Sequence, residues 1–155
     1  MNEYDILIIG SGPGGYVAAV RASQLGLKVA VIEKAETGGI CLNWGCIPTK
    51  ALLKSAQVLD YARHATDYGI NAGEVPAPDF GAVIARSRGV ADAMSKGVQF
   101  LFKKHNIRVI NGFGRLKSTG TVEVEAADGT KELYNAGSII IATGARSREL
   151  PNLKQ

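Results

Sequence analysis

An apolar run that ends in a glycine-rich turn constrains this chain's fold more than any other feature. Residues 4–9 (YDILII) are branched and apolar, which is typical of a short buried parallel strand. The turn that follows, Gly10-Ser-Gly-Pro-Gly-Gly15, matches G-x-G-x-x-G. A helical pattern over 13–25 and a second apolar strand over 28–33 come next. The first 33 residues therefore predict a βαβ unit with a right-handed crossover.

The three glycines of this turn have the spacing that a bound nucleotide requires. Gly10 would make the tight turn, Gly12 would let a pyrophosphate approach the backbone, and Gly15 would let helix and strand pack closely. The helix N-terminus would offer N–H groups to the phosphates. Glu33, at the end of the second strand, would accept hydrogen bonds from a ribose. The pattern predicts an adenine dinucleotide site without separating FAD from NAD, and a glycine-rich surface turn is the alternative.

Composition limits the class of protein further. With 46% hydrophobic and 21% charged residues in 155, disorder and coiled coil are excluded. No apolar run approaches the roughly 20 residues of a membrane span, and no secretory signal pattern is present. We therefore expect a cytoplasmic protein with no membrane partner.

Basic residues are concentrated between Arg86 and Lys117, where eight of them accompany one acid, Asp92. Such a stripe could attract nucleic acid. However, aromatic residues are not interleaved in the pattern that stacks bases. We favour a solvated helix face and predict no nucleic-acid partner.

The rest of the chain predicts two long helices and then short strands. The helices are expected over 49–65 and 80–105, the second with core positions Val83, Ile84, Val90, Met94, Val98 and Leu101. After His105 the apolar period changes to two, which predicts strands over 107–110, 121–125 and 131–134, with a hairpin turn at Asp128-Gly129, and a buried strand over 138–142. The predicted fold is α/β: a Rossmann-like parallel sheet with helices and a three-stranded antiparallel β-meander.

The chain has two cysteines, Cys41 and Cys46, in a segment (34–47) that is expected to be irregular. The two histidines, His64 and His105, are remote from them, so we predict no metal site. On a regular helix, side chains five residues apart diverge by about 140°.

The residues next to the pair favour redox chemistry. Gly45 and Pro48 would allow an irregular path that brings the sulfurs within bonding distance. A helix start directly after the pair, with Lys50 in its first turn, would favour a thiolate. Two inert cysteines are the alternative.

The segment from Gly38 to Lys50 (GGICLNWGCIPTK) resembles the redox-active disulfide motif of the flavin-dependent pyridine nucleotide–disulfide oxidoreductases. Its Ile47-Pro-Thr-Lys50 is more similar to the dihydrolipoamide dehydrogenases than to the glutathione, trypanothione or mercuric reductases. The resemblance covers residues 1–150, including Ala142-Thr-Gly-Ala145. Ile40 stands where the family usually has threonine, and Trp44 where valine is common. These departures touch the surroundings of the flavin and leave the cysteines intact.

The resemblance implies an enzyme that oxidises dihydrolipoamide with NAD, through FAD and a Cys41–Cys46 disulfide. Cys46 would be the thiol nearest the flavin, Cys41 the interchange thiol, and Lys50 a cation close to the reactive nitrogen of the flavin ring. Gly114 would approach the adenine. The implied FAD site comprises Ile9, Gly10, Gly12, Pro13, Gly14, Gly15, Glu33, Lys34, Gly39, Cys41, Gly45, Cys46, Lys50, Gly114, Thr143, Gly144 and Ala145.

The resemblance also implies that residues 1–150 are the N-terminal, incomplete part of an FAD-binding domain, and that 151–155 begin a linker to an NAD domain. In the family, a dimerisation domain supplies a His–Glu base, and neither His64 nor His105 matches that motif. We expect the isolated chain to be inactive. The full-length protein is expected to be a homodimer that acts on dihydrolipoamide or a lipoyl-bearing protein, with a place in a 2-oxo acid dehydrogenase complex.

Two other functions stay open at this point. The parent protein could be another disulfide reductase of the glutathione or mercuric type. It could also be a non-catalytic dinucleotide-binding module in which the cysteines are structural.

Overall fold

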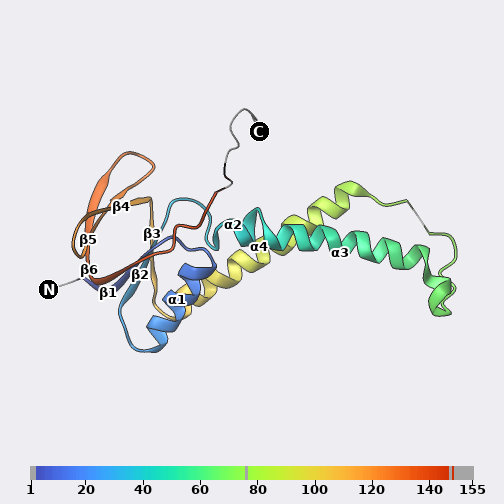
Figure 1. Ribbon diagram of the computed structural model, residues 1–155, viewed down its shortest axis with the longest axis horizontal. Coiled ribbons are helices and arrows are strands. Elements are labelled where there is room, and N and C mark those ends of the chain that lie inside the picture. The colour runs from blue at the N-terminus through green and yellow to red at the C-terminus, as the bar shows by residue number, and fades with distance from the viewer. Residues whose placement is uncertain (1–2, 76, 147, 149–155) are drawn as a thin grey trace.

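The computed structural model describes residues 3–75, 77–146 and 148, which form a six-stranded sheet and a long helical hairpin (Figure 1). The predicted start of a linker at 151–155 lies outside the described residues. In chain order the elements are β1 (Tyr4–Ile9), α1 (Pro13–Gln24), β2 (Val29–Glu33), α2 (Gly39–Asn43), α3 (Cys46–Arg63), the 3-10 helix η1 (Ala65–Tyr68), α4 (Phe80–Lys104), β3 (Arg108–Asn111), β4 (Phe113–Ser118), β5 (Thr121–Glu125) and β6 (Lys131–Ile141).

The sheet has a parallel half and an antiparallel half, in the order β3-β2-β1-β6-β5-β4. β1 pairs in parallel with both β2 and β6, and β2 pairs in parallel with β3. β4, β5 and β6 form an antiparallel meander. The predicted α/β fold, a Rossmann-like parallel sheet with a three-stranded meander, is confirmed.

Both faces of the sheet are covered at β1 and β2, which is why residues 6–9 and 29–32 are apolar without interruption. On one face, Ile8 and Val31 pack against α1 and the C-terminal part of α4, where Phe102 is buried. On the other face, Leu7 and Ile32 pack against meander residues such as Val122. All five residues of β2 are buried. The core therefore lies on both sides of β1 and β2.

Helices α1, α3 and α4 and the first two strands were predicted to within a few residues, but two predictions for the later strands were wrong. The strand predicted over 107–110 is not part of the meander, because β3 pairs in parallel with β2. The strands predicted over 131–134 and 138–142 are one strand, β6. Its first residues pair with β5, and those from Ala136 onward pair with β1. The meander instead begins with β4, which the alternation of apolar residues did not reveal.

The prediction of an irregular segment over 34–47 was also partly wrong. Residues 39–43 form the short helix α2, and α3 begins at Cys46, two residues before Pro48.

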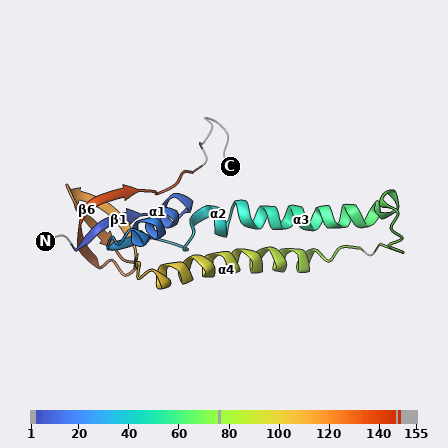
Figure 2. The same ribbon diagram turned by 90° about the horizontal axis from the view of Figure 1, so that it is seen from below.

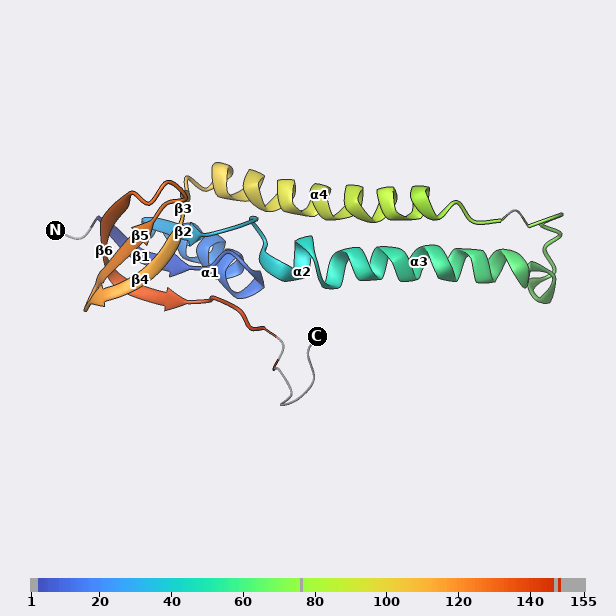
Figure 3. The same ribbon diagram turned by 90° about the horizontal axis from the view of Figure 1, so that it is seen from above.

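Helices α3 and α4 run antiparallel and project well beyond the sheet (Figures 2 and 3). Of its 18 residues α3 buries two, Pro48 and Ala51. In α4 the buried stripe is mostly small: Ser87, Ala91, Ser95, Val98 and Phe102. Of the predicted core positions Val98 is buried, Val83, Val90 and Leu101 are partly buried, and Ile84 and Met94 are exposed. None of the helices in the described ranges has the length and apolarity needed to cross a membrane.

Candidate functional site

The candidate site lies where β1 and β6 end side by side. The Ala142 amide donates to the Ile9 carbonyl at 2.8 Å, and the Gly10 amide donates to the Ile32 carbonyl at 2.8 Å. Gly10 has φ +100°, and a Cβ on it would overlap the Ala142 carbonyl oxygen and approach the Thr143 Cα to 3.2 Å. The structure thus brings together the glycine turn and the distant Thr143 segment. Ligands of open α/β sheets bind at such carboxyl ends of strands.

The other two glycines of the fingerprint differ in their surroundings. A Cβ on Gly15 would overlap the Gly10 carbonyl oxygen, so Gly15 is required by the packing of the chain itself. A Cβ on Gly12 would meet nothing within 4 Å. Pro13 is the first residue of α1, and no side chain caps this helix among the residues that the structure describes. Open space and uncapped amides at Gly12 fit a bound phosphate.

The carboxylate of Glu33 is held by the glycine turn. Its Oε2 accepts hydrogen bonds from the Ser11 amide at 2.8 Å and the Ser11 hydroxyl at 2.6 Å, and its Oε1 accepts one from the Ala35 amide at 2.9 Å. Glu33 and Ser11 are both buried. A carboxylate has about four acceptor positions, so roughly one remains for a ligand. Sequence reasoning missed Ser11, because a serine inside a glycine motif carries no signal of its own.

Two further predicted residues lie close to this edge of the sheet. A Cβ on Gly114 would lie 3.2 Å from Ile9 Cγ2 and 3.3 Å from Ile32 Cγ2, so its lack of a side chain lets β4 cross close to β1 and β2. The Lys34 ammonium lies 5.6 Å from the centre of the Phe113 ring. Gly114 thus has a structural role in the meander, and contact of either residue with a cofactor remains a prediction.

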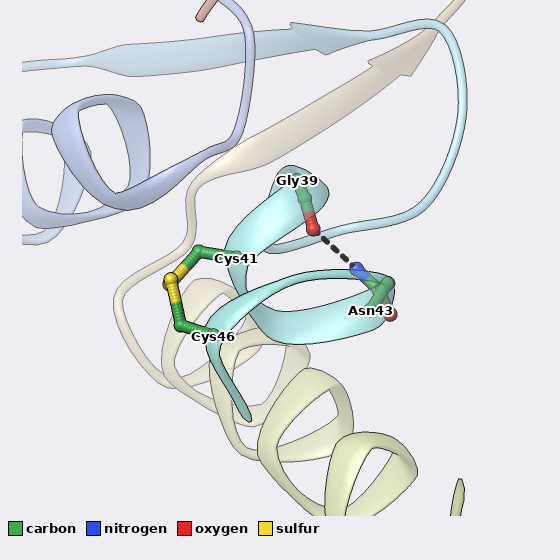
Figure 4. Close-up of a disulfide and its surroundings, with 4 residues drawn as sticks. All are labelled: Gly39, Cys41, Asn43 and Cys46. Atoms are coloured by element: carbon green, nitrogen blue, oxygen red, sulfur yellow. Dashed lines mark hydrogen bonds between the residues drawn. A yellow bond between two sulfur atoms is a disulfide. The ribbon is translucent and has the colours of Figure 1, made fainter. Parts of the chain in front are cut away.

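Cys41 and Cys46 form a disulfide with a Cα–Cα distance of 4.7 Å (Figure 4). Cys41 lies in α2 and Cys46 is the first residue of α3. The backbone of Gly45, at φ −120° and ψ −112°, breaks the helical path between them. The Trp44 amide closes α2 by donating to the Ile40 carbonyl at 2.8 Å. The irregular path expected at Gly45 is therefore what brings the sulfurs together.

The two cysteines differ in exposure and setting. Cys46 is exposed and Cys41 is partly buried. Cys46 occupies the N-terminus of an 18-residue helix, where the helix dipole favours negative charge. Lys50 is exposed one turn further along the same helix. Trp44 and Ile40, which flank the cysteines, are each 56% exposed.

The disulfide segment is hydrogen-bonded to the glycine turn and packs directly against it. The Gly38 amide donates to the Ser11 hydroxyl at 3.2 Å. Gly39 has φ +65°, and a Cβ on it would approach the Gly12 Cα to 2.8 Å. The two motifs are therefore in contact, and Ser11 connects Glu33 to the disulfide segment.

Basic residues of α4 contact the helices that carry the cysteines. Arg86 Nη1 donates to the Ala51 carbonyl at 2.9 Å, and Arg88 Nη1 donates to the Asn43 carbonyl at 2.9 Å. At least these two members of the basic stripe thus have partners within the chain. Residues 3–75, 77–146 and 148 contain no group of three or more His, Cys, Asp or Glu side chains placed to hold a metal ion.

Comparison with known proteins agrees with this arrangement. The model of the family described as pyridine nucleotide-disulphide oxidoreductase matches residues 4–155. The chain is 50% identical to a dihydrolipoyl dehydrogenase of Rhizobium etli, covering 99% of this chain and 35% of that protein. It is 49% identical to one of Zymomonas mobilis (98% and 32%) and 43% identical to one of Acholeplasma laidlawii (99% and 45%).

The chain thus spans between about a third and just under half of the length of these relatives. Family membership does not depend on that share, because the family model covers nearly the whole chain. The resemblance in the cysteine segment is confirmed: the chain belongs to the pyridine nucleotide-disulphide oxidoreductase family.

Proposed function

We propose that this chain is the FAD-binding part of a dihydrolipoyl dehydrogenase, in which the Cys41–Cys46 disulfide oxidises a dihydrolipoyl group. One observation carries the proposal. A disulfide with an exposed Cys46 lies at the start of a long helix, and the segment that contains it is hydrogen-bonded to a dinucleotide-type glycine turn. The identity of 43–50% to proteins named dihydrolipoyl dehydrogenase supports this substrate class over glutathione or mercuric ion.

The residues at the C-terminal ends of β1 and β6 fit FAD. The open side of Gly12 and the first amides of α1 would receive the pyrophosphate, and the remaining acceptor position of Glu33 would receive a ribose hydroxyl. Thr143, Gly144 and Ala145 follow β6 beside this turn and would line the same site. When bound, the flavin would supply the acceptor for two electrons and the means to pass them to NAD.

The thiol step follows from the cysteines themselves. One thiolate of the dihydrolipoyl group attacks Cys41 Sγ, the Cys41–Cys46 bond breaks, and Cys46 leaves as a thiolate. The second substrate thiol then loses its proton and attacks the substrate sulfur of the mixed disulfide, which closes the lipoyl ring and releases the Cys41 thiolate. The substrate loses two electrons and the protein disulfide gains them.

The geometry of α3 favours this direction of attack. The N-terminal end of the helix stabilises a Cys46 thiolate, which makes Cys46 the better leaving group. Lys50, one turn along, adds positive charge on the same helix. We therefore assign interchange with substrate to Cys41 and contact with the flavin to Cys46.

The remaining expectations concern the whole protein and are proposals of the same kind. They are NAD as second substrate, a homodimer, a lipoyl-bearing partner in a 2-oxo acid dehydrogenase complex and a cytoplasmic location. We also propose that the 155 residues alone do not reduce NAD with dihydrolipoamide, because the sequence contains one dinucleotide fingerprint and we assign it to FAD.

Thiol labelling and monothiol trapping of the oxidised chain test the assignment of roles. Dihydrolipoamide is added to the oxidised chain, and the released thiols are labelled and located by mass spectrometry. We expect both Cys41 and Cys46 to become labelled. When the oxidised chain is instead trapped with a limiting monothiol, the adduct should sit on Cys41. An adduct mainly on Cys46 would reverse the roles, and a disulfide that dihydrolipoamide leaves intact would overturn the proposed function.

A further inference from the structure

The backbone carbonyl of Thr37, just before the disulfide segment, accepts side-chain hydrogen bonds from two different helices. Asn43 Nδ2, from α2, donates to it at 3.1 Å, and the Ser95 hydroxyl, from α4, donates at 2.8 Å. Thr37 and Ser95 are both buried. Residues 58 positions apart in the sequence are thus joined at one atom beside the redox pair.

Asn43 lies between the two cysteines and uses both of its amide hydrogens. Besides Thr37, its Nδ2 donates to the Gly39 carbonyl at 2.9 Å, the bond drawn in Figure 4. The bond to Thr37 ties α2 to the residues that precede it, the bond to Gly39 lies within α2, and α2 carries Cys41. The backbone carbonyl of Asn43 in turn accepts the hydrogen bond from Arg88 of α4.

We infer that Asn43 and Ser95 are positioning residues for the redox disulfide: they hold α2 against α4 so that Cys41 stays opposite Cys46. Neither side chain is bonded to a sulfur, so both act through the Thr37 carbonyl and the orientation of α2. This inference rests on the proposed function of the disulfide and extends it to two residues other than the cysteines.

The expected consequence is thermodynamic. A protein disulfide resists reduction in proportion to the effective concentration of one thiol at the other, and restraint of the segment raises that concentration. After reduction the two thiols separate unless α2 is held. Losing one buried hydrogen bond would therefore shift the thiol–disulfide equilibrium toward the dithiol by about three- to tenfold.

The experiment uses the 155-residue chain in a dithiothreitol redox buffer, with the reduced fraction counted by thiol labelling. Dithiothreitol forms a mixed disulfide with one cysteine and then closes its own ring, leaving two protein thiols, so the equilibrium constant is read directly. The variants are Ser95→Ala and Asn43→Asp, which turns a donor into an acceptor facing two carbonyls. Ser87→Ala is the control for the first, since Ser87 is also buried on α4. Asn71→Asp controls for the second, because Asn71 Oδ1 accepts a hydrogen bond from the Gly73 amide and an aspartate oxygen can accept the same bond.

We expect the equilibrium constant to move toward the dithiol by about three- to tenfold for Ser95→Ala, by more for Asn43→Asp, and by less than twofold for both controls. Unfolding of the oxidised proteins is followed in parallel. Variants that lower the unfolding temperature but keep the wild-type equilibrium constant would show a purely structural role and overturn the inference. A shift of the same size in the controls would also overturn it. A wild-type disulfide that dithiothreitol reduces but dihydrolipoamide does not would count against the proposed function and leave this comparison intact.

Discussion

The C-terminal ends of β1 and β6 and the helical hairpin of α3 and α4 differ in how many hydrogen bonds and packing contacts hold each residue in place. At the sheet edge, Ser11 and Glu33 are buried and bonded to each other and to backbone amides. In the hairpin beyond the disulfide, large side chains such as Leu53, Tyr68 and Phe80 are more than 60% exposed. The hairpin becomes well packed only where α4 passes the cysteines and α1. The difference indicates that residues around the proposed site contribute more to the stability of the fold than residues at the far end of the hairpin do.

The largest contrast is expected from one substitution made in both regions. Leu7→Ala removes a side chain that is fully buried in β1, and should lower the free energy of unfolding by about 2–5 kcal/mol. Leu53→Ala removes one that is 64% exposed on α3, and should change it by less than about 0.5 kcal/mol. Urea unfolding of the two variants measures both values. Equal losses would mean that the hairpin is packed as tightly as the sheet.

Two glycines of the same turn should behave differently. Gly15→Ala places a Cβ on the Gly10 carbonyl oxygen and should destabilise the fold by about 3 kcal/mol. Gly12→Ala enters open space and should cost under about 1 kcal/mol, while weakening FAD binding about tenfold or more. Unfolding and FAD titration are measured on both. If Gly12→Ala binds FAD like the wild type, the phosphate does not lie over Gly12.

Loss of the disulfide should affect thiol exchange with dihydrolipoamide more than it affects the free energy of unfolding. Because the closed loop is short, Cys46→Ser should lower the free energy of unfolding by only about 2 kcal/mol. Exchange with dihydrolipoamide should be lost completely. Reduced wild-type protein, unfolded in the same denaturant, serves as the control. A much larger loss of stability would make the disulfide primarily structural.

The last effect is confined to high pH and comes from the meander. The Tyr134 hydroxyl donates to the Glu132 carboxylate, and this bond together with burial raises the pKa of Tyr134 to about 12. The folded state therefore keeps this proton to a higher pH than the unfolded state does. The resulting stabilisation is complete below pH 10 and is lost as the pH rises toward 12. Between these pH values, the free energy of unfolding of Tyr134→Phe, measured by urea unfolding, should fall less steeply than that of the wild type. Identical slopes in the two proteins would contradict the raised pKa.

The local sequence pattern predicted the strand, the turn and the helix break that form the site. The features that it missed depend on which distant segments pair in the folded chain. The strand over 4–9, the glycine turn and the break at Gly45 could be predicted because each has a local cause in side-chain type or backbone conformation. The partner of β3 could not, because a four-residue strand with two apolar residues fits a parallel and an antiparallel neighbour equally well. Ser11, Asn43 and Ser95 could not either, since a hydrogen bond to a distant carbonyl leaves no periodic trace in the sequence. The buried stripe of α4 was missed for a related reason: it consists largely of serine and alanine.

The absorption spectrum of the FAD-loaded chain, recorded before and after dihydrolipoamide, tests the central claim most directly. We predict a long-wavelength band after reduction, from a Cys46 thiolate beside the flavin. Cys41→Ser should show this band without any dithiol, and Cys46→Ser should never show it. A flavin-containing chain whose disulfide is reduced by dihydrolipoamide with no such band, or with the same band in Cys46→Ser, would contradict the account.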